Sequence, residues 1–600
     1  MFNSEQKKRF KIFNRRSFIL LSLKLGLFSL VTWKLFDIQI LQSKKYKTLS
    51  KKNQINFEIL YPIRGEILDR NNIIIALNKN TYDLFLIPEQ SPNIEETLNK
   101  LNDFITISFK TRRKVIELSN KVKKFQRVKI LKNINWDDLE NIEANKNYLP
   151  GLHLQLVPQR IYPYNKYFSH ILGYISQPSE EEIQLPYITN MPTLDIGKTG
   201  IEKKFNKILI GLAGKREIEV NAFGREIREI SRISSQKGDN INISIDSRVQ
   251  TFVQKELSKH KAGSVVLIDV NSGEILSMVS VPDFDPNLII KKPNKIYWNT
   301  LLNNSLSPLL NRSIQGLYAP GSTFKMIVAL SGLQKGVIDS KKSIFCNGKI
   351  EFGGQLYHCW KTKGHGKVNI IKAIKESCDC FFYELALKIG IEDIAKTAKE
   401  FGLGAVSEIG FENEKKGIVP SIKWKKENKK ENWYAGETLT TGIGQGYLLA
   451  TPLQLSLMTA RIANNGKKIQ PILYDNLIKN DFNKINFSPK HMKLVKNSMN
   501  KVVNEPGGTA YKSRSSNYIY AGKTGTSQVK KITLEERESE DFRKKEKEWK
   551  NKDHALFVGY MPADNPRYAI SVVIEHGGSG SSAAAPIAKK IFDFIYMKKI

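Results

Sequence analysis

A serine and a lysine three residues apart, Ser322 and Lys325, stand where the chain enters an apolar run. The segment "APGSTFKMIVALSGLQKG" (319–336) opens with a Pro-Gly turn and closes with Gly336, which is typical of a helix with both ends marked. The serine is then expected at a helix N-terminus, where free N–H groups favour developing negative charge. Lys325 follows one turn later on the same face, and in its neutral form it can take the serine's proton. The alternative is a capping serine followed by an ordinary surface lysine.

The Ser-x-x-Lys pattern alone is not specific, because Ser258 and Lys261 match it too. Two further motifs follow Ser322 in order: Ser-Cys-Asp at 377–379 and Lys-Thr-Gly-Thr at 523–526. Ordered Ser-x-x-Lys, Ser-x-Asp/Asn and Lys-Thr-Gly motifs are the signature of penicillin-recognising serine acyl-transferases. The order favours a nucleophilic role for Ser322.

Each motif residue has an expected task in acyl transfer. Ser377 can relay the proton to the leaving amine, and Lys523 is expected to hold the cleft positive. The backbone N–H groups of Ser322 and Thr526 can form an oxyanion hole. Gly525 is expected to let a substrate backbone lie along a strand edge. The predicted catalytic residues are Ser322, Lys325, Ser377 and Lys523. The predicted substrate-binding residues are Asp379, Thr524, Gly525 and Thr526.

The elements that position these motifs indicate one α+β domain over residues 241–600. "GSVVLIDVNSGEILSMVS" (263–280) predicts two strands around an Asn-Ser-Gly turn. Helices are expected to about residue 465, including one that begins with Thr451, Pro452 and Gln454. The remaining expected elements are strands at 518–529, 554–562 and 567–577 and a last helix at about 584–597. The charged stretch 530–553 is interpreted as a solvated insertion between strands.

The N-terminus combines a basic tail at 1–16 with an apolar run at 17–38. The run has about the length of a single membrane-spanning helix, and the basic flank is expected to stay in the cytoplasm. No small-residue cleavage site follows, so we interpret it as an uncleaved anchor. Lys24 near its middle must snorkel or face a protein partner. Residues 40–240 are irregular and predict a separate domain outside the membrane.

The chain has 600 residues and a formal net charge of +35, which raises nucleic acid as a partner. Its lysines are scattered along the whole sequence, and no zinc finger, RNP-type motif or basic heptad helix is present. We therefore expect no nucleic-acid binding. Hydrophobic residues at 41% allow a sizeable core.

Taken together, the motifs resemble the class B penicillin-binding proteins, and among them the elongation-specific penicillin-binding protein 2 branch. The resemblance extends over nearly the whole chain, as these segments show: "RGEILDRN" (64–71), "RIYPY" (160–164), "DIGKTGIEKKFN" (195–206), "APGSTFK" (319–325), "TTGIGQGYLLATPLQL" (440–455) and "AGKTGTS" (521–527). It implies a membrane anchor, an elongated pedestal at 40–240, and a transpeptidase domain at 241–600 with a serine β-lactamase-like antiparallel sheet and a helical subdomain.

The resemblance also implies the activity and its surroundings. Ser322 would attack the penultimate D-alanine of a peptidoglycan stem peptide, and an acceptor amine would then take the acyl group; β-lactams would acylate the same serine. The implied partners are a SEDS-family glycan polymerase of the RodA type and an MreC-type scaffold. The implied location is the inner membrane, with a single pass and the catalytic domain in the periplasm. Asp379 departs from the commoner asparagine, and an ionised carboxylate cannot donate a hydrogen bond to substrate.

All four cysteines fall between 346 and 380, with histidines among them. Cys346, Cys359, His365 and Cys378 form a Cys₃His set that suits structural zinc. Cys378 lies inside the second motif, so a metal there would pin the active-site loop. A disulfide is the alternative in an oxidising compartment.

Other functions share part of this pattern. A β-lactamase needs a deacylating base and seldom keeps a pedestal, and a D,D-carboxypeptidase would use water as the acceptor. A penicillin-acylated signalling receptor carries several spans or a cytoplasmic effector. A scaffold without catalysis is disfavoured by the intact catalytic residues.

Overall fold

The computed structural model describes residues 4–45, 55–121, 124, 127–188, 194–220, 226–291, 295–407, 409–474, 482–530 and 548–600. Most of the charged stretch that the sequence predicts as an insertion, residues 531–547, lies outside the described residues. The chain forms two compact units built from interleaved segments. The first holds residues 1–62, 82–156 and 212–236, and the second holds 63–81, 157–211 and 237–600. The domain boundary at 240 therefore stays a prediction.

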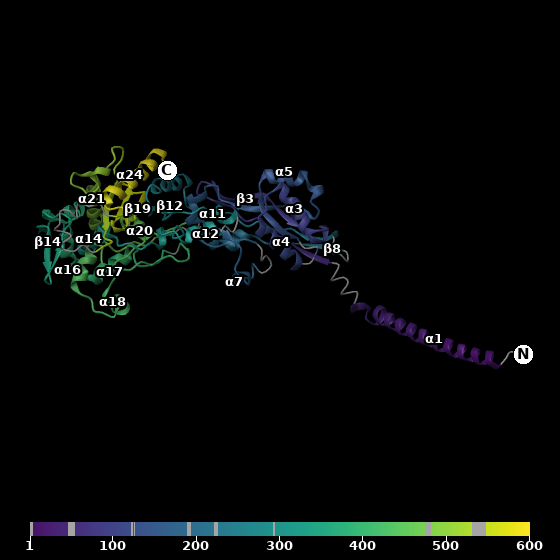
Figure 1. Cartoon of the computed structure of the whole chain (residues 1–600). Helices are drawn as coiled ribbons and strands as arrows, with labels where there is room; N and C mark the ends of the chain where they lie inside the picture. Colours follow the sequence, from purple (N-terminus) through teal and green to yellow (C-terminus); the bar gives the residue numbers. More distant parts are fainter. Residues whose placement is uncertain are drawn as a thin grey trace. The chain divides into compact units, whose positions relative to one another are not determined.

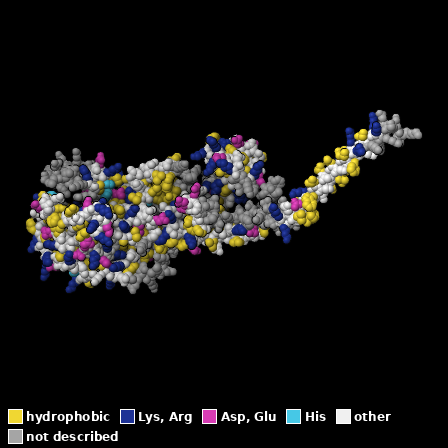
Figure 2. Space-filling model, turned by 90° about the horizontal axis from the view of Figure 1, so that it is seen from below, with side chains coloured by type: hydrophobic (Ala, Val, Ile, Leu, Met, Phe, Trp, Pro, Cys, Tyr) yellow, Lys and Arg dark blue, Asp and Glu magenta, His cyan; other side chains and the backbone are white. Residues whose placement is uncertain are grey.

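The first unit begins with one long apolar helix, α1 (Ser4–Phe36), followed by a short π-helical turn. Residues Ile12–Leu41 are long and apolar enough to cross a membrane, with a mean hydropathy of 1.6. Figure 2 shows hydrophobic side chains along this helix and Lys and Arg side chains toward its N-terminal end. Helix α1 begins at Ser4 and therefore includes most of the basic segment 1–16, which the sequence predicts as a separate tail.

The rest of the first unit has its own small core. Three helices and a strand enclose buried aliphatic side chains such as Leu98, Leu101 and Val128. The same unit also contains a three-stranded antiparallel sheet in the order β1–β8–β9. The bounds are β1 (Ile55–Leu60), α3 (Ile94–Phe104), α4 (Phe109–Lys121), β4 (Val128–Ile134), α5 (Trp136–Ala144), β8 (Gly214–Val220) and β9 (Glu226–Ile233). Strands β3 (Ile74–Leu86) and β5 (Leu152–Ile161) contain the points where the chain passes between units.

The second unit is organised around a five-stranded antiparallel sheet in the order β12–β11–β19–β18–β17. Its strands are β11 (Gly263–Asp269), β12 (Ile275–Val281), β17 (Ala521–Ser527), β18 (His554–Met561) and β19 (Tyr568–Ile574). Nearly every residue of these strands is buried, because helices cover the sheet. The order places β17, which carries the Lys-Thr-Gly motif, at one edge of the sheet.

Helices α10 (Ser247–Leu257) and α24 (Ala585–Lys598) pack against each other, and Phe252 stacks on Phe594 at 4.2 Å between ring centroids. Helix α20 (Pro452–Ala463) packs along β19, β11 and β18 (Figure 1). The other longer helices of this unit are α14 (Lys325–Lys335), α15 (Ile370–Lys375), α16 (Asp379–Ile389), α17 (Ile391–Glu400), α18 (Ile422–Lys429), α19 (Ala435–Gly442) and α21 (Pro489–Asn504).

The remaining elements of the second unit are short. They are β2 (Ile67–Leu68), α6 (Ser169–Leu172), β6 (Ile175–Ser176), α7 (Glu180–Ile183), β7 (Ile196–Gly197), α8 (Gly200–Lys204), α9 (Asn206–Ile210), β10 (Ile241–Asn242), α11 (Pro286–Lys291), α12 (Lys295–Leu302), α13 (Arg312–Gln315), β13 (Ser343–Cys346), β14 (Lys349–Phe352), β15 (Gln355–His358) and β16 (Gly366–Asn369).

The α+β prediction is confirmed, and so are its local signals. The Asn-Ser-Gly turn joins β11 to β12, with Gly263 opposite Val281. Thr451 and Gln454 form the capping box of α20, as their spacing predicts. The three late strands and the last helix lie within the ranges expected from the sequence, give or take one residue.

Candidate active site

Ser322 lies in a one-turn 3₁₀ helix, Gly321–Phe324, directly before α14. Its side chain is partly exposed and makes no cap hydrogen bond. Within the part of the chain that the structure describes, no hydrogen bond holds its Oγ. The neighbouring Thr323 hydroxyl instead donates to Pro320 O at 2.7 Å. The capping alternative for Ser322 is therefore wrong, and its hydroxyl is available for chemistry.

Gly321 brings this turn against the catalytic strand. Its φ is +53°, and a Cβ there would lie 2.5 Å from Thr526 O and 3.3 Å from Thr526 N. Gly525 makes the same approach from the other side, since a Cβ on it would lie 2.8 Å from the Thr323 side chain. Close packing of the nucleophile turn thus requires Gly525, which the sequence analysis had assigned to substrate contact alone.

The second motif places a hydroxyl between two lysines. Ser377, with φ at +57°, starts the turn into α16. Lys325 Nζ lies 3.2 Å from Ser377 Oγ, and Lys523 Nζ lies 2.9 Å from the same oxygen. These lysines are 52 and 146 residues away from Ser377 in the sequence. The predicted catalytic lysines and Ser377 are therefore brought together around one oxygen atom.

The Asp379 carboxylate forms an ion pair with the amine of Lys325. Its Oδ1 accepts a hydrogen bond from Lys325 Nζ at 2.7 Å, and its Oδ2 accepts one from the Trp360 backbone N–H at 2.8 Å. Both carboxylate oxygens thus have protein partners. A direct contact of Asp379 with substrate stays a prediction, and the structure gives this carboxylate a positioning task.

The expected role of Lys523 in holding the cleft positive stays a prediction, and its burial bears on its charge. Its side chain is fully buried, and burial lowers the pKa of its amine well below the usual range. The positive charge of Lys325 lowers this pKa further, and only Asp379 opposes the shift. Thr524, next along β17, is nearly buried, and its hydroxyl shares a hydrogen bond of 2.7 Å with Thr509.

Two segments of the site were not assigned by sequence reasoning. Gly444 O accepts the Gly321 N–H at 2.8 Å, and Gln445 Nε2 donates to Thr526 O at 3.0 Å, so this loop ties the nucleophile turn to β17. Trp360 is largely exposed, yet its Nε1 donates to Ser377 O at 3.1 Å. The unusual "GIGQG" run at 442–446 was the available signal for the loop, and nothing local marks Trp360.

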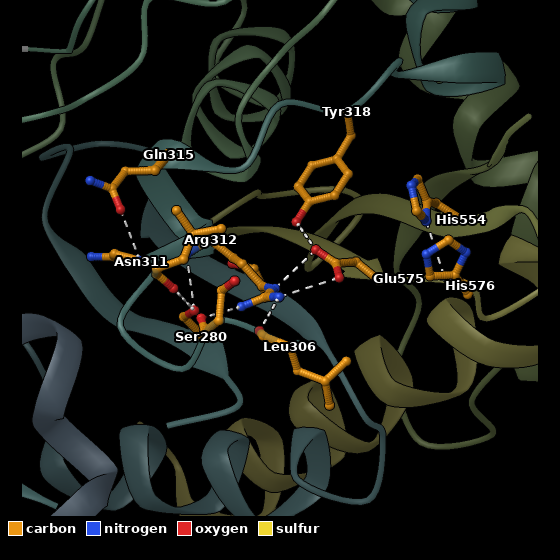
Figure 3. A network of polar contacts seen from close by, with 12 residues as sticks. Ser280, Leu306, Asn311, Arg312, Gln315, Tyr318, His554, Glu575 and His576 are labelled. Carbon is orange, nitrogen blue, oxygen red and sulfur yellow. Dashed lines mark hydrogen bonds and ion pairs between the residues drawn. The ribbon is translucent and has the colours of Figure 1, made fainter. Parts of the chain in front are cut away.

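A buried polar network supports the start of the nucleophile segment (Figure 3). Tyr318 OH donates to Glu575 Oε1 at 2.7 Å, and Arg312 Nε donates to the same oxygen at 2.9 Å. The Tyr318 ring also meets the His554 ring edge-on, and His554 pairs with Ser527 at the end of β17. Burial lowers the pKa of His554 to about 4, so it is neutral at physiological pH. The network thus joins the nucleophile segment to the end of the catalytic strand.

The four residues predicted as metal ligands lie together. The ligand atoms of Cys346, Cys359, His365 and Cys378 are all within 4.8 Å of one another, and the four residues are buried. His365 Nδ1 is 3.7 Å from Cys346 Sγ and 3.5 Å from Cys359 Sγ. All cysteines are free thiols. Hydrogen bonds from the Cys378 thiol, followed by that of Cys380, lower the pKa of the Cys359 thiol.

Comparisons with known proteins agree with this geometry. The penicillin-binding protein transpeptidase domain matches residues 263–593, and the penicillin-binding protein dimerisation domain matches residues 59–243. The peptidoglycan D,D-transpeptidase MrdA of Escherichia coli K12 is 32% identical over 582 residues, which cover 94% of this chain and 91% of the relative.

Two solved structures of peptidoglycan-synthesising proteins are also similar to this chain. In the complex between penicillin-binding protein 2 and MreC from Helicobacter pylori, the similar chain is 31% identical with a TM-score of 0.79, covering 90% of this chain and 99% of that one. A solved peptidoglycan synthase complex that coordinates polymerization and crosslinking contains a chain 26% identical with a TM-score of 0.71, covering 96% and 97%.

The serine turn, the lysine pair and the edge strand define a serine acyl-transferase of the penicillin-recognising class. The matched transpeptidase domain covers more than half of the chain, and near full-length relatives are 32% identical. The chain belongs to the penicillin-binding protein family, among its peptidoglycan D,D-transpeptidases.

Proposed function

We propose that this chain cross-links peptidoglycan stem peptides during cell elongation through an acyl-enzyme on Ser322, and that β-lactams acylate the same hydroxyl. The observation that carries this proposal is the convergence of three distant motifs. Ser377 Oγ contacts the amines of both Lys325 and Lys523, and the nucleophile turn packs on the edge strand that carries Lys523. One hydroxyl, its base and a proton relay are thereby assembled beside the edge strand of the sheet.

The reaction has two acyl transfers. Ser322 Oγ attacks the carbonyl carbon of the penultimate D-alanine and gives its proton to Lys325. The bond to the terminal D-alanine breaks, and its nitrogen leaves with a proton relayed through Ser377. An acceptor amine on another stem peptide then attacks the ester carbonyl, and the proton it loses passes through Lys325 to Ser322 Oγ as the ester bond breaks. The N–H groups of Ser322 and Thr526 are the proposed donors to the oxyanion of both steps, and the close approach of Gly321 to Thr526 supports this assignment.

Labelling with a fluorescent penicillin tests this assignment. The full chain in detergent is expected to form a slowly hydrolysed adduct, and mass spectrometry of the digested protein should find it on the peptide with Ser322. Ser322→Ala should lose the label because no nucleophile remains. Ser258→Ala is the matched control, since exposed Ser258 also precedes a lysine by three residues. Label retained by Ser322→Ala, or lost from both variants, would contradict the proposal.

The setting of the reaction follows from the helix and the relatives. The apolar helix supports a single-pass anchor in the inner membrane, with the catalytic unit in the periplasm. One similar protein is solved with MreC, and another belongs to a peptidoglycan synthase complex that couples polymerization to crosslinking. We therefore propose an MreC-type scaffold and a SEDS-family glycan polymerase of the RodA type as partners.

The cysteine cluster is proposed to hold a structural zinc ion. Tetrahedral zinc with bond lengths of about 2.3 Å to sulfur and about 2.0 Å to nitrogen places its ligand atoms about 3.6 Å apart. The distances of 3.5 and 3.7 Å from His365 Nδ1 to two sulfurs fit this spacing. Cys359 Sγ also accepts the Asp379 N–H at 3.4 Å, and the next residue, Trp360, donates to the Asp379 carboxylate. Zinc bound at this cluster would hold Asp379, and thereby Lys325, in place.

Metal analysis of the purified full chain should find about one zinc per chain. Cys359→Ser should lose the zinc and lower the melting temperature, because three ligands bind zinc weakly and the Asp379 contact is removed. Cys380→Ser should keep its zinc, because the Cys380 thiol contacts Cys359 and Cys346 but lies outside the four-ligand set. A zinc content near zero in the unmodified chain would contradict the zinc proposal. A disulfide found by mass spectrometry would support the alternative pairing of the cysteines.

A further inference from the structure

The connection between β19 and α24 contacts both the nucleophile segment and the catalytic strand. At its start, Glu575 Oε1 accepts a hydrogen bond of 2.7 Å from Tyr318 OH, in the segment that leads to Ser322. Further along, a Cβ on Gly580 would lie 2.3 Å from Gly525 O, so the same connection packs closely on β17. One short stretch of chain therefore meets the two elements whose mutual position decides the geometry of acyl transfer.

Arg312 holds the Glu575 carboxylate in place (Figure 3). Its Nε donates to Glu575 Oε1 at 2.9 Å, and its Nη2 donates to Leu306 O at 2.7 Å. The side chains of Arg312 and Glu575 are only 4% and 17% exposed, so water screens this ion pair weakly. Burial raises the pKa of Glu575, but the charge of Arg312 and its hydrogen bond outweigh burial, and the carboxyl is ionised at neutral pH.

The turn after β19 fixes the direction in which Glu575 points. His576 has φ at +54°, and its backbone N–H donates to His554 Nδ1 at 3.0 Å. Its side-chain Nδ1 lies 2.9 Å from Lys552 O, which can only accept a hydrogen bond. Both contacts reach the chain at the start of β18. The carboxylate is therefore held by a turn that is itself anchored to the central sheet.

Tyr318 connects this carboxylate to the nucleophile turn. Burial, followed by the charge of Glu575, raises the pKa of Tyr318, so its hydroxyl stays the donor of the hydrogen bond. The Tyr318 backbone pairs with Ala450 in both directions, at 3.0 and 2.9 Å, and Gly321 N–H donates to Gly444 O at 2.8 Å. These backbone contacts connect the segment to the loop before α20. The phenol hydroxyl connects it to the end of β19.

We propose that Glu575 is a positioning residue for acylation, which acts through Tyr318 to hold the nucleophile turn against β17. The inference rests on the acyl-transfer function proposed above. Glu575 exchanges no proton with substrate; it keeps the N–H groups of Ser322 and Thr526 directed at one oxyanion. Donors of this kind lower the barrier of acylation, so their displacement slows the chemical step more than it weakens reversible binding.

A second network in the same unit provides a chemically matched control. Glu202 Oε1 also accepts one hydrogen bond from an arginine Nε, that of Arg160 at 2.7 Å, and one from a tyrosine, Tyr162 OH at 3.1 Å. Both tyrosine side chains are buried. The residues of the second network lie in segments 160–164 and 195–206, outside the three motifs of the site. Tyr162→Phe therefore deletes the same atom from the same kind of network without touching the nucleophile segment.

The test compares Tyr318→Phe with Tyr162→Phe in the full chain. The rate of labelling by fluorescent penicillin is measured against its concentration, which gives the Kd and the rate constant of acylation at saturation. Both variants should lower the melting temperature, because each leaves a buried carboxylate with one donor fewer. Tyr318→Phe should slow acylation by about 10- to 100-fold, as expected for a displaced reacting group. Its Kd, and both constants of Tyr162→Phe, should stay within about twofold of the unmodified chain.

Glu575→Met identifies Glu575 as the group through which Tyr318 acts. It should slow acylation at least as much as Tyr318→Phe does, and the double variant should be no slower than Glu575→Met alone. Should Glu575→Met fail to fold, the two tyrosine variants still decide. Acylation by Tyr318→Phe at the unmodified rate, equal slowing by Tyr162→Phe, or slowing that multiplies in the double variant would overturn the proposal. Failure of the proposed function differs from all of these, because the unmodified chain would then carry no label on Ser322.

Discussion

Replacing Lys325 with methionine is expected to slow acylation at Ser322 by about 10²–10⁴-fold and to lower the free energy of unfolding by about 3–5 kcal/mol. The first effect follows from loss of the base. The second follows because the side chain of Lys325 is 0% exposed and that of Asp379 only 12%, so the variant leaves a nearly buried carboxylate without its counterion. Methionine fills a similar volume, which keeps cavity formation out of the comparison. Acylation is followed with fluorescent penicillin and stability with denaturant unfolding of the catalytic unit within the full chain.

The double variant Lys325→Met, Asp379→Asn separates these effects. The amide removes the unpaired charge and can still accept the Trp360 N–H through its oxygen. We expect it to recover about 2 kcal/mol of the lost stability while acylation stays low. Stability that does not recover would mean that the Lys325–Asp379 pair is not what the single variant broke. Recovered acylation would mean that Lys325 is not the base.

The sequence predicts the elements that are marked by residues close together in the chain, such as turns and helix caps. A Gly-containing turn between two β-branched runs determines the hairpin of β11 and β12, and Thr451 with Gln454 satisfies the free N–H groups that begin α20. Both depend on residues a few positions apart. The interleaving of the two compact units depends on packing between distant segments, so no local pattern marked it.

In the candidate site, too, the sequence predicts what depends on local motifs and does not predict what depends on contacts between distant residues. The order of the three motifs was enough to name Ser322, Lys325, Ser377 and Lys523, because spacing and residue type carry that information. The order of the motifs does not predict the proton-transfer role of each lysine, because that role depends on which lysine contacts a carboxylate. Lys325 meets the Asp379 carboxylate, whereas Lys523 is buried without an ion pair among the described residues, and burial lowers its pKa. The sequence likewise predicts only a substrate contact for Gly525, because its close packing against Thr323 joins segments about 200 residues apart.

Glu202→Gln is expected to destabilise the catalytic unit by about 3–5 kcal/mol at neutral pH. The Glu202 carboxylate is fully buried and accepts hydrogen bonds of 2.7 Å from Arg64 Nε and Arg160 Nε and one of 3.1 Å from Tyr162 OH. An amide of the same size leaves two buried guanidinium groups without their counterion. Glu274→Gln is the matched control, because its pair with Arg70 is exposed and should contribute less than about 1 kcal/mol.

The pH dependence gives this prediction a second, independent readout. Burial by itself raises the pKa of Glu202, but the charges of Arg160 and then Arg64 outweigh it and hold the pKa below its usual value. A carboxyl with a lowered folded pKa stabilises the fold above the unfolded value of about 4.3 and loses that contribution as pH falls through the folded pKa. The stability gap between the unmodified chain and Glu202→Gln should therefore be constant from pH 6 to 8, begin to narrow near the unfolded value, and close as pH falls through the lowered folded pKa. A gap that persists in acid would show that the amide disturbs packing, and that the ion pairs are not the source of the stability.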